Sequence, residues 1–173
     1  RRHALDRGDD DVAGLVLGLL TSGAWISPHD VRAEVLEIAA ELKLARNVEI
    51  FRGEHLAHSS PERLVAQCWD LAGLDRRYAA FIARWSREFE HCAQCGMTGA
   101  RAGIHKPCTA PADCFRRRFL LVHEYRAFPL EDPLLPGPLL PAGWNGKAAA
   151  RLFETYHDVL AGPAERFVAD VCA

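Results

Sequence analysis

The chain of 173 residues is 49% hydrophobic, which is enough for one core of ordinary size or for two small ones. Its formal net charge of −2 and its pI of about 6.5 give the chain as a whole no general attraction to nucleic acid. The longest apolar run, at 12–20, is far shorter than the roughly 20 residues of a membrane-spanning helix, and no signal-peptide core precedes it. We therefore expect a cytoplasmic protein without a membrane anchor.

The first part of the chain carries strand and helix signals in alternation. Residues 17–26, which are apolar apart from a Thr21-Ser22-Gly23 break, predict a bent strand or hairpin that ends at Pro28. Asp30 is a suitable cap for the helix that follows, whose apolar residues fall at helical spacing: Val31, Val35, Ile38 and Leu42. Residues 48–52 predict a further strand, and Gly53 is its stop. This order predicts a small, incomplete α/β layer.

From Ser59 onward the signals are helical only. Ser59-Ser60-Pro61-Glu62 combines a capping box with a proline in the first helical turn, and Gly73 predicts a break before a stronger helix at 74–91. Further helices are predicted at 115–127 and 147–160, the last of them ended by Gly162-Pro163. The predicted core stripes are Leu64, Val65, Cys68 and Leu71; Leu74, Tyr78, Phe81, Ile82, Trp85 and Phe89; and Leu152, Phe153, Tyr156 and Leu160.

Catalytic motifs are missing from the sequence. His123 and Glu124 are neighbours on a predicted helix, where adjacent side chains point about 100° apart, so they cannot act on one proton together. The sequence also has no nucleophile elbow, phosphate-binding loop or zinc-protease motif. We therefore expect a protein that is not an enzyme.

Two arginines of the helix at 115–127 are candidate ligand contacts. Arg126 lies on the same helical face as an apolar stripe formed by Phe115, Phe119 and Val122, and Arg118 lies along the edge of that face. An arginine that faces a core needs a partner. Either Asp132 pairs with Arg126 within the protein, or Arg126 and Arg118 hold a phosphate or carboxylate of a ligand. Trp144, in a Pro/Gly-rich loop, is a candidate cover for that ligand.

Four of the six cysteines fall within residues 90–114. Cys92 and Cys95 have the CxxC spacing of a zinc knuckle, followed by Gly96. Three cysteines with one histidine, or four cysteines, would complete a structural zinc site, and the candidate ligands are Cys92, Cys95, His105, Cys108 and Cys114. The segment has little apolar content, so a metal would supply its folding energy. Thiols without metal and disulfides are the alternatives.

Residues 112–146 carry a family resemblance in a series of motifs. In order, these are His123-Glu124-Tyr125-Arg126, Asp132-Pro133-x-Leu135-Pro136, Leu139-Leu140-Pro141 and Trp144-x-Gly146. Their order and spacing resemble the C-terminal region of PaaX-type bacterial repressors, the regulators of phenylacetate catabolism. The segment Gly23-Ala24-Trp25 looks like the central domain of that family, and Cys68-Trp69-Asp70-Leu71 looks like the start of its C-terminal helices. Residues 90–114 are an insertion relative to the family pattern.

The resemblance implies an α+β protein, with a partial ferredoxin-like α/β domain at 1–58 and an all-α domain at 59–173. It implies the effector-binding and dimerisation portion of a repressor that leaves operator DNA when an aryl or acyl-CoA thioester binds. The family's winged helix has no counterpart here, and the chain starts at Arg1 and not at Met, so we expect the DNA-binding domain upstream. The predicted ligand-binding residues are Arg118, His123, Arg126 and Trp144. The alternative is a zinc-stabilised or thiol redox-sensing module for protein interaction that has no small-molecule effector.

Overall fold

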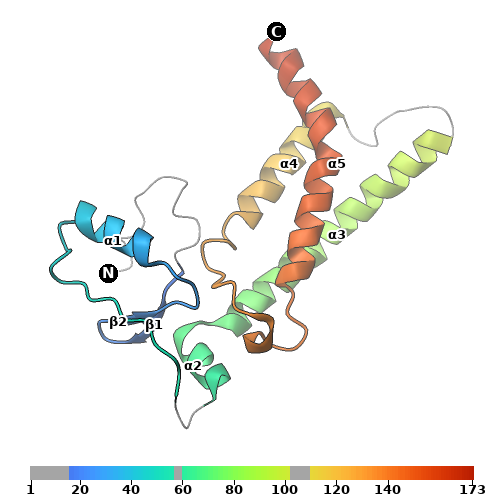
Figure 1. Cartoon of the computed structure of the whole chain (residues 1–173). Coiled ribbons are helices and arrows are strands. Elements are labelled where there is room, and N and C mark those ends of the chain that lie inside the picture. Colours follow the sequence, from blue (N-terminus) through green and yellow to red (C-terminus); the bar gives the residue numbers. More distant parts are fainter. Residues whose placement is uncertain (1–15, 57–59, 102–109) are drawn as a thin grey trace. The chain divides into compact units, whose positions relative to one another are not determined.

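The computed structural model describes residues 16–56, 60–101 and 110–173, with the backbone alone at 92–101 (Figure 1). Its elements are β1 (Gly18–Thr21), β2 (Ala24–Ile26), α1 (Arg32–Glu41), α2 (Pro61–Cys68), α3 (Leu71–Arg101), α4 (Pro111–Tyr125), the short 3-10 helix η3 (Gly137–Leu139) and α5 (Gly146–Cys172). Helices dominate beside one two-stranded antiparallel sheet, which confirms the α+β class, whereas the ferredoxin-like arrangement stays a prediction. None of the described helices is both long and apolar enough to span a membrane.

The chain forms two compact units. Unit 1 contains the residues up to Leu71 together with 128–141, and unit 2 contains 72–127 together with 142–173. The loop at 128–141 thus belongs to the same unit as the strands, although α4 precedes it and α5 follows it in the sequence. The domain limits predicted from the sequence, 1–58 and 59–173, stay a prediction.

In unit 1, the hairpin of β1 and β2 packs against the segment that follows α2. The two strands pair with Gly18 opposite Ile26, and Gly23 takes a left-handed φ of 87° in the turn between them. A Cβ atom at Gly18 would lie only 2.6 Å from Cζ2 of Trp69, so this strand approaches the indole ring more closely than any larger residue allows. The side chain of Gln67 also donates a hydrogen bond to the carbonyl of Leu20, at 3.2 Å.

The Asp-Pro-x-Leu-Pro motif has a structural role in unit 1. Asp132 is buried, and its Oδ1 accepts a hydrogen bond of 2.8 Å from the backbone N–H of Leu134, which has a left-handed φ of 49°. Nε2 of His29 donates to the carbonyl of Pro133, at 2.9 Å. A carboxylate that holds a strained turn is the kind of partner that a non-glycine residue with positive φ requires.

Two predictions about unit 1 were inexact or wrong. Among the described residues only β1 and β2 are strands, so the strand predicted at 48–52 is not formed, and the side chain of Phe51 is 89% exposed. A β-branched segment becomes a strand only where another strand pairs with it, and local sequence does not supply that partner. The cap of α1 is Val31, one residue later than the predicted Asp30.

Unit 2 is a core of three helices built on the predicted apolar stripes. Trp85 of α3 and Tyr156 of α5 are almost fully buried, with ring centroids 6.0 Å apart. Phe81 of α3 meets Tyr125 of α4 at 5.5 Å. The residues of unit 2 that are at least nine-tenths buried and apolar are Leu74, Tyr78, Phe81, Trp85, Cys114, Leu121, Ala149, Tyr156, Leu160 and Ala164. Most of the stripe predicted for residues 74–89 is therefore confirmed as core.

Two predicted helix breaks were wrong. Gly73 lies within α3, and the chain breaks earlier, at Trp69 and Asp70. Helix α5 continues through Pro163 to Cys172. A proline inside a helix costs about 3 kcal/mol because it removes one backbone hydrogen bond and its ring clashes with the preceding turn. Leu160 and Ala164, on either side of Pro163, are each 1% exposed, and their burial offsets that cost.

The start of α5 is fixed to α3 by the Trp-Asn-Gly motif. Asp75 of α3 accepts two hydrogen bonds from Asn145, one from the backbone N–H at 2.8 Å and one from the side chain at 3.1 Å. The ring of Trp144 packs edge-on against Tyr78, with centroids 5.6 Å apart. Gly146 lies directly beneath the indole, where a Cβ atom would be 2.4 Å from Nε1 of Trp144.

Replacing Gly146 with Ala should lower the free energy of unfolding by about 1–3 kcal/mol, because the added methyl group overlaps the indole of Trp144. Chemical denaturation monitored by circular dichroism measures the change. Gly137→Ala is the matched control, since a Cβ atom there meets nothing within 4 Å. Equal losses in the two variants would contradict the packing described for the Trp-Asn-Gly motif.

Candidate functional site

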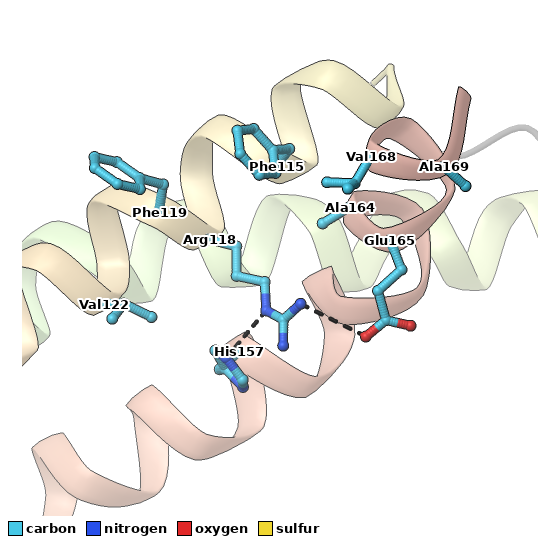
Figure 2. Close-up of a pocket in the computed structure, with 9 residues that line it drawn as sticks. All are labelled: Phe115, Arg118, Phe119, Val122, His157, Ala164, Glu165, Val168 and Ala169. Carbon is cyan, nitrogen blue, oxygen red and sulfur yellow. Dashed lines mark hydrogen bonds and ion pairs between the residues drawn. The ribbon is translucent and has the colours of Figure 1, made fainter. Parts of the chain in front are cut away.

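A groove of about 540 Å³ lies between α4 and α5 of unit 2 (Figure 2). Its apolar lining consists of Phe115, Phe119, Val122, Ala164, Val168 and Ala169. Its polar lining consists of Arg118, His157 and Glu165. A volume of this size is typical of sites for small molecules, and an apolar wall with few polar groups is their usual composition.

The groove follows from the helical spacing of its residues. Phe115, Phe119 and Val122 occupy positions i, i+4 and i+7 of α4, on the side opposite the buried Leu121. On α5, Ala164 and Val168 are again four residues apart, and the small side chains of Ala164 and Ala169 leave space in front of the phenylalanines. Phe119 is 62% exposed. Exposed aromatic side chains beside a groove are the kind of group that contacts the apolar part of a ligand.

Arg118 reaches from α4 toward two residues of α5, as Figure 2 shows. Its Nε donates a hydrogen bond to Nε2 of His157, at 3.0 Å. Its Nη1 lies 3.6 Å from Oε1 of Glu165, a distance that fits an ion pair but is too long for a hydrogen bond. Since a guanidinium group only donates, Nε2 of His157 must be the acceptor, and the ring proton lies on Nδ1. That nitrogen faces Oδ1 of Asp158, at 3.7 Å.

Of the four predicted ligand-binding residues, the structure places only Arg118 in the groove lining. His123 lies at its edge, where its ring stacks on that of Phe119 with centroids 6.2 Å apart. Arg126 is exposed at the end of α4, because the face that it shares with Phe119 points outward and not into the core. Trp144 is half-buried against Tyr78 at the start of α5. The ligand-binding roles of these residues stay predictions.

Two lining residues, His157 and Glu165, were missed in the sequence. They are eight positions apart on α5, which places them about 80° apart around the helix and therefore on one side of it. The sequence offered a signal in this spacing. Gly162-Pro163 obscures this signal, because the pair predicts the end of the helix and so places Glu165 outside the element that carries His157.

Glu124 binds α3 and has no part in the groove. It accepts hydrogen bonds from Nη1 of Arg84 at 2.8 Å and from Nε1 of Trp85 at 3.0 Å. Its neighbour His123 contacts Phe119 on the outer side of α4. The two side chains therefore contact different parts of unit 2, as their adjacent helix positions predict.

The predicted zinc site falls largely outside the described residues. Cys92 and Cys95 lie in the helical backbone of α3, at positions whose side chains are not described, and His105 and Cys108 lie outside the described ranges. Cys114 is buried in α4 at 4% exposure. Within the described ranges, no group of three or more His, Cys, Asp or Glu side chains is suitably placed for a metal ion. Zinc binding therefore stays a prediction.

Comparisons with known proteins find relatives for both parts of the chain. A family model described as the PaaX protein central Cas2-like domain matches residues 2–65, and one described as the PaaX-like protein C-terminal domain matches residues 69–170. The transcriptional repressor PaaX of Escherichia coli (strain K12) is 30% identical over 156 residues, which are 88% of this chain and 46% of that protein. The chain thus spans about half the length of the curated relative. Every residue that lines the groove lies within the C-terminal match.

Among the described cysteines, Cys172 should react with iodoacetamide about tenfold faster than Cys68 or Cys114 at pH 8. Cys172 is exposed and Cys114 is buried, while burial raises the pKa of the Cys68 thiol and so lowers its thiolate fraction. Peptide mass spectrometry after timed labelling measures the three rates. In denaturant the rates should converge, and equal rates in the folded protein would contradict the burial of Cys68 and Cys114.

Proposed function

Since this chain belongs to the PaaX-like family, we propose that it is the effector-binding and dimerisation portion of a transcriptional repressor and that it acts as a regulator, not as an enzyme. Operator DNA would be bound by a winged helix that lies outside this chain. The two family models that match this chain are those of the central and C-terminal domains, which supports that division. The observation that carries the effector role is the apolar groove with Arg118 in its wall.

The proposed effector is an aryl or acyl-CoA thioester whose acyl group occupies the groove. Phe115, Phe119 and Val168 offer apolar contacts to an acyl chain or ring, and Arg118 offers a cation to an anionic group. The coenzyme A moiety would extend beyond the groove lining. We therefore propose His123 and Arg126, both exposed toward the end of α4, as contacts for its phosphates, with Trp144 as a further contact.

The distribution of charge supports a polyanionic ligand at unit 2. This unit holds 13 of the 21 Lys and Arg residues and 9 of the 23 Asp and Glu residues, a formal charge of +4. Unit 1 holds the remaining 8 Lys and Arg residues and the remaining 14 Asp and Glu residues, a formal charge of −6. The near-neutral total thus hides a basic unit and an acidic one. A basic surface raises the local concentration of an anionic effector around the groove.

Release from DNA would follow from a shift between two arrangements of α4 and α5. The groove takes its lining from both helices, so a ligand that fills it favours the arrangement in which they are correctly spaced. The effect on DNA affinity can be at most as large as the ratio of the ligand affinities of the two arrangements.

For unit 1, we propose a homodimer contact and a partial ferredoxin-like fold. The large apolar side chains that it leaves exposed lie on several of its segments: Leu19, Trp25, Leu36, Leu42, Leu44, Ile50, Phe51, Leu56, Leu130 and Leu134. An apolar surface of this extent favours association. Residues 48–52 include the β-branched Val48 and Ile50 and have no strand beside them in the described ranges, which fits a sheet that is completed elsewhere.

An aryl or acyl-CoA thioester should bind the protein in calorimetric titration, and Phe119→Ala should weaken that binding about tenfold because it removes an aromatic wall of the groove. Phe51→Ala is the control, since Phe51 is a more exposed phenylalanine in unit 1. Failure of every thioester in a varied set to bind would refute the effector role. Equal weakening by both substitutions would place the site elsewhere.

We also propose a structural zinc ion in the cysteine-rich insertion at 90–114. Protein purified without chelator should carry about one zinc per chain, and Cys92→Ser or Cys95→Ser should abolish it by removing a thiolate ligand. Elemental analysis measures the metal, with Cys172→Ser as the control. Separate replacement of His105, Cys108 and Cys114 identifies the remaining ligands. Metal-free protein whose thiols react at once would favour the alternative of a redox-sensing interaction module.

A further inference from the structure

The guanidinium of Arg118 is held unequally by its two partners on α5. Its Nε is fixed by a hydrogen bond of 3.0 Å to His157, which is partly buried. Among the described residues its Nη1 end meets only a carboxylate oxygen of Glu165, at 3.6 Å, and the Glu165 side chain is 70% exposed. One end of the fork is therefore oriented by the protein, and the other end makes a loose and solvated ion pair.

The loose end is the one that a ligand in the groove would meet. Arg118 and Glu165 both line the groove, and the Arg118 side chain is 28% exposed. A guanidinium presents parallel N–H groups that match a carboxylate, sulfonate or phosphate, and that match improves as water leaves the site. Glu165 occupies this position with poor geometry, and an exposed ion pair contributes little to stability.

We propose that Glu165 is an internal competitor, which occupies the anion-binding end of Arg118 in the empty groove and is displaced by the anionic group of the effector. His157 is the positioning residue, which accepts from Nε and aims the opposite end of the guanidinium into the groove. The ligand class is an amphipathic anion with an aromatic or aliphatic body and one anionic group beside it. This inference rests on the proposed effector role of the groove and adds the source of its specificity.

Competition by Glu165 explains why a ligand needs both an apolar body and an anionic group. A neutral apolar molecule fills the groove and leaves the Arg118–Glu165 pair in place. A small anion, such as acetate or inorganic phosphate, must displace Glu165 with little or no apolar contact to compensate. Only a molecule with both parts gains the apolar contacts and replaces the carboxylate at Arg118, so Glu165 discriminates against free anions.

The experiment compares two fluorescent probes that share an aromatic body and differ in charge. 1-Anilinonaphthalene-8-sulfonate carries a sulfonate, and N-phenyl-1-naphthylamine is its uncharged analogue. Glu165→Gln should strengthen binding of the sulfonate about two- to fivefold, the ratio that corresponds to loss of an exposed ion pair, and should leave the neutral probe unchanged. Asp170→Asn, a neutralised carboxylate on the same helix outside the groove lining, is the matched control.

Substitutions of His157 test its positioning role with the same two probes. His157→Ala should weaken sulfonate binding about three- to tenfold with a smaller effect on the neutral probe, and His157→Gln should restore it because a carboxamide oxygen also accepts from Nε. Arg118→Ala should remove the preference for the sulfonate, whereas Arg116→Ala, on the same helix but outside the lining, should retain it.

Several results would overturn the inference. If Glu165→Gln strengthens both probes or neither, Glu165 is not a competitor. If His157→Gln behaves like His157→Ala, the hydrogen bond to Nε does not position the arginine. Competition by benzoyl-CoA, coenzyme A and benzoate then identifies which anionic group reaches Arg118. Charge-dependent probe binding without displacement by any thioester would retain the inference and refute the proposed effector.

Discussion

The acceptance of two hydrogen bonds by Glu124 fixes the orientation of α4 in unit 2. The donors are the side chains of Arg84 and Trp85, which are consecutive residues of α3. Because both hydrogen bonds end on one carboxylate of α4, this helix can rotate little about its own axis without breaking them. Trp85 is also packed against Tyr156, which brings α5 into the same cluster. With one side of α4 committed to α3, its remaining apolar side has to face outward. The groove is therefore a consequence of how the core is assembled.

The second requirement of the groove is that α5 does not stop at Pro163. The residues before it supply His157, and those after it supply Ala164, Glu165 and Val168. A helix that ended at Gly162 would leave Arg118 with one partner and Phe115 without an opposite wall. The cost of a proline within the helix is offset by core contacts that lie immediately beside it. The site thus depends on a proline that disfavours the helix locally and on core packing that keeps the helix continuous.

The sequence predicted those features that depend on local periodicity. The stripe on α3 and the helix at α4 are read from side-chain spacing alone. The same spacing places Phe115, Phe119 and Val122 on one face of α4, but the prediction that this face meets the core was wrong, since Phe119 is 62% exposed. The motifs around Asp132 and Trp144 led to the correct family, although the structure shows both to be folding elements. The strand predicted at 48–52 is not formed, and the partners of Arg118 were not predicted. Both depend on contacts between segments that are distant in the sequence.

The loop at 128–141 has a consequence for how this protein can be divided. The main chain passes from one unit to the other three times, after Leu71, after Ala127 and after Pro141. A single truncation at any of these points therefore never isolates one complete unit, because each unit consists of two separate stretches of the chain. The same topology ties the end of α4 and the start of α5 to a single stretch of unit 1. The residues that connect α4 to α5 are therefore residues whose own packing partners lie in unit 1.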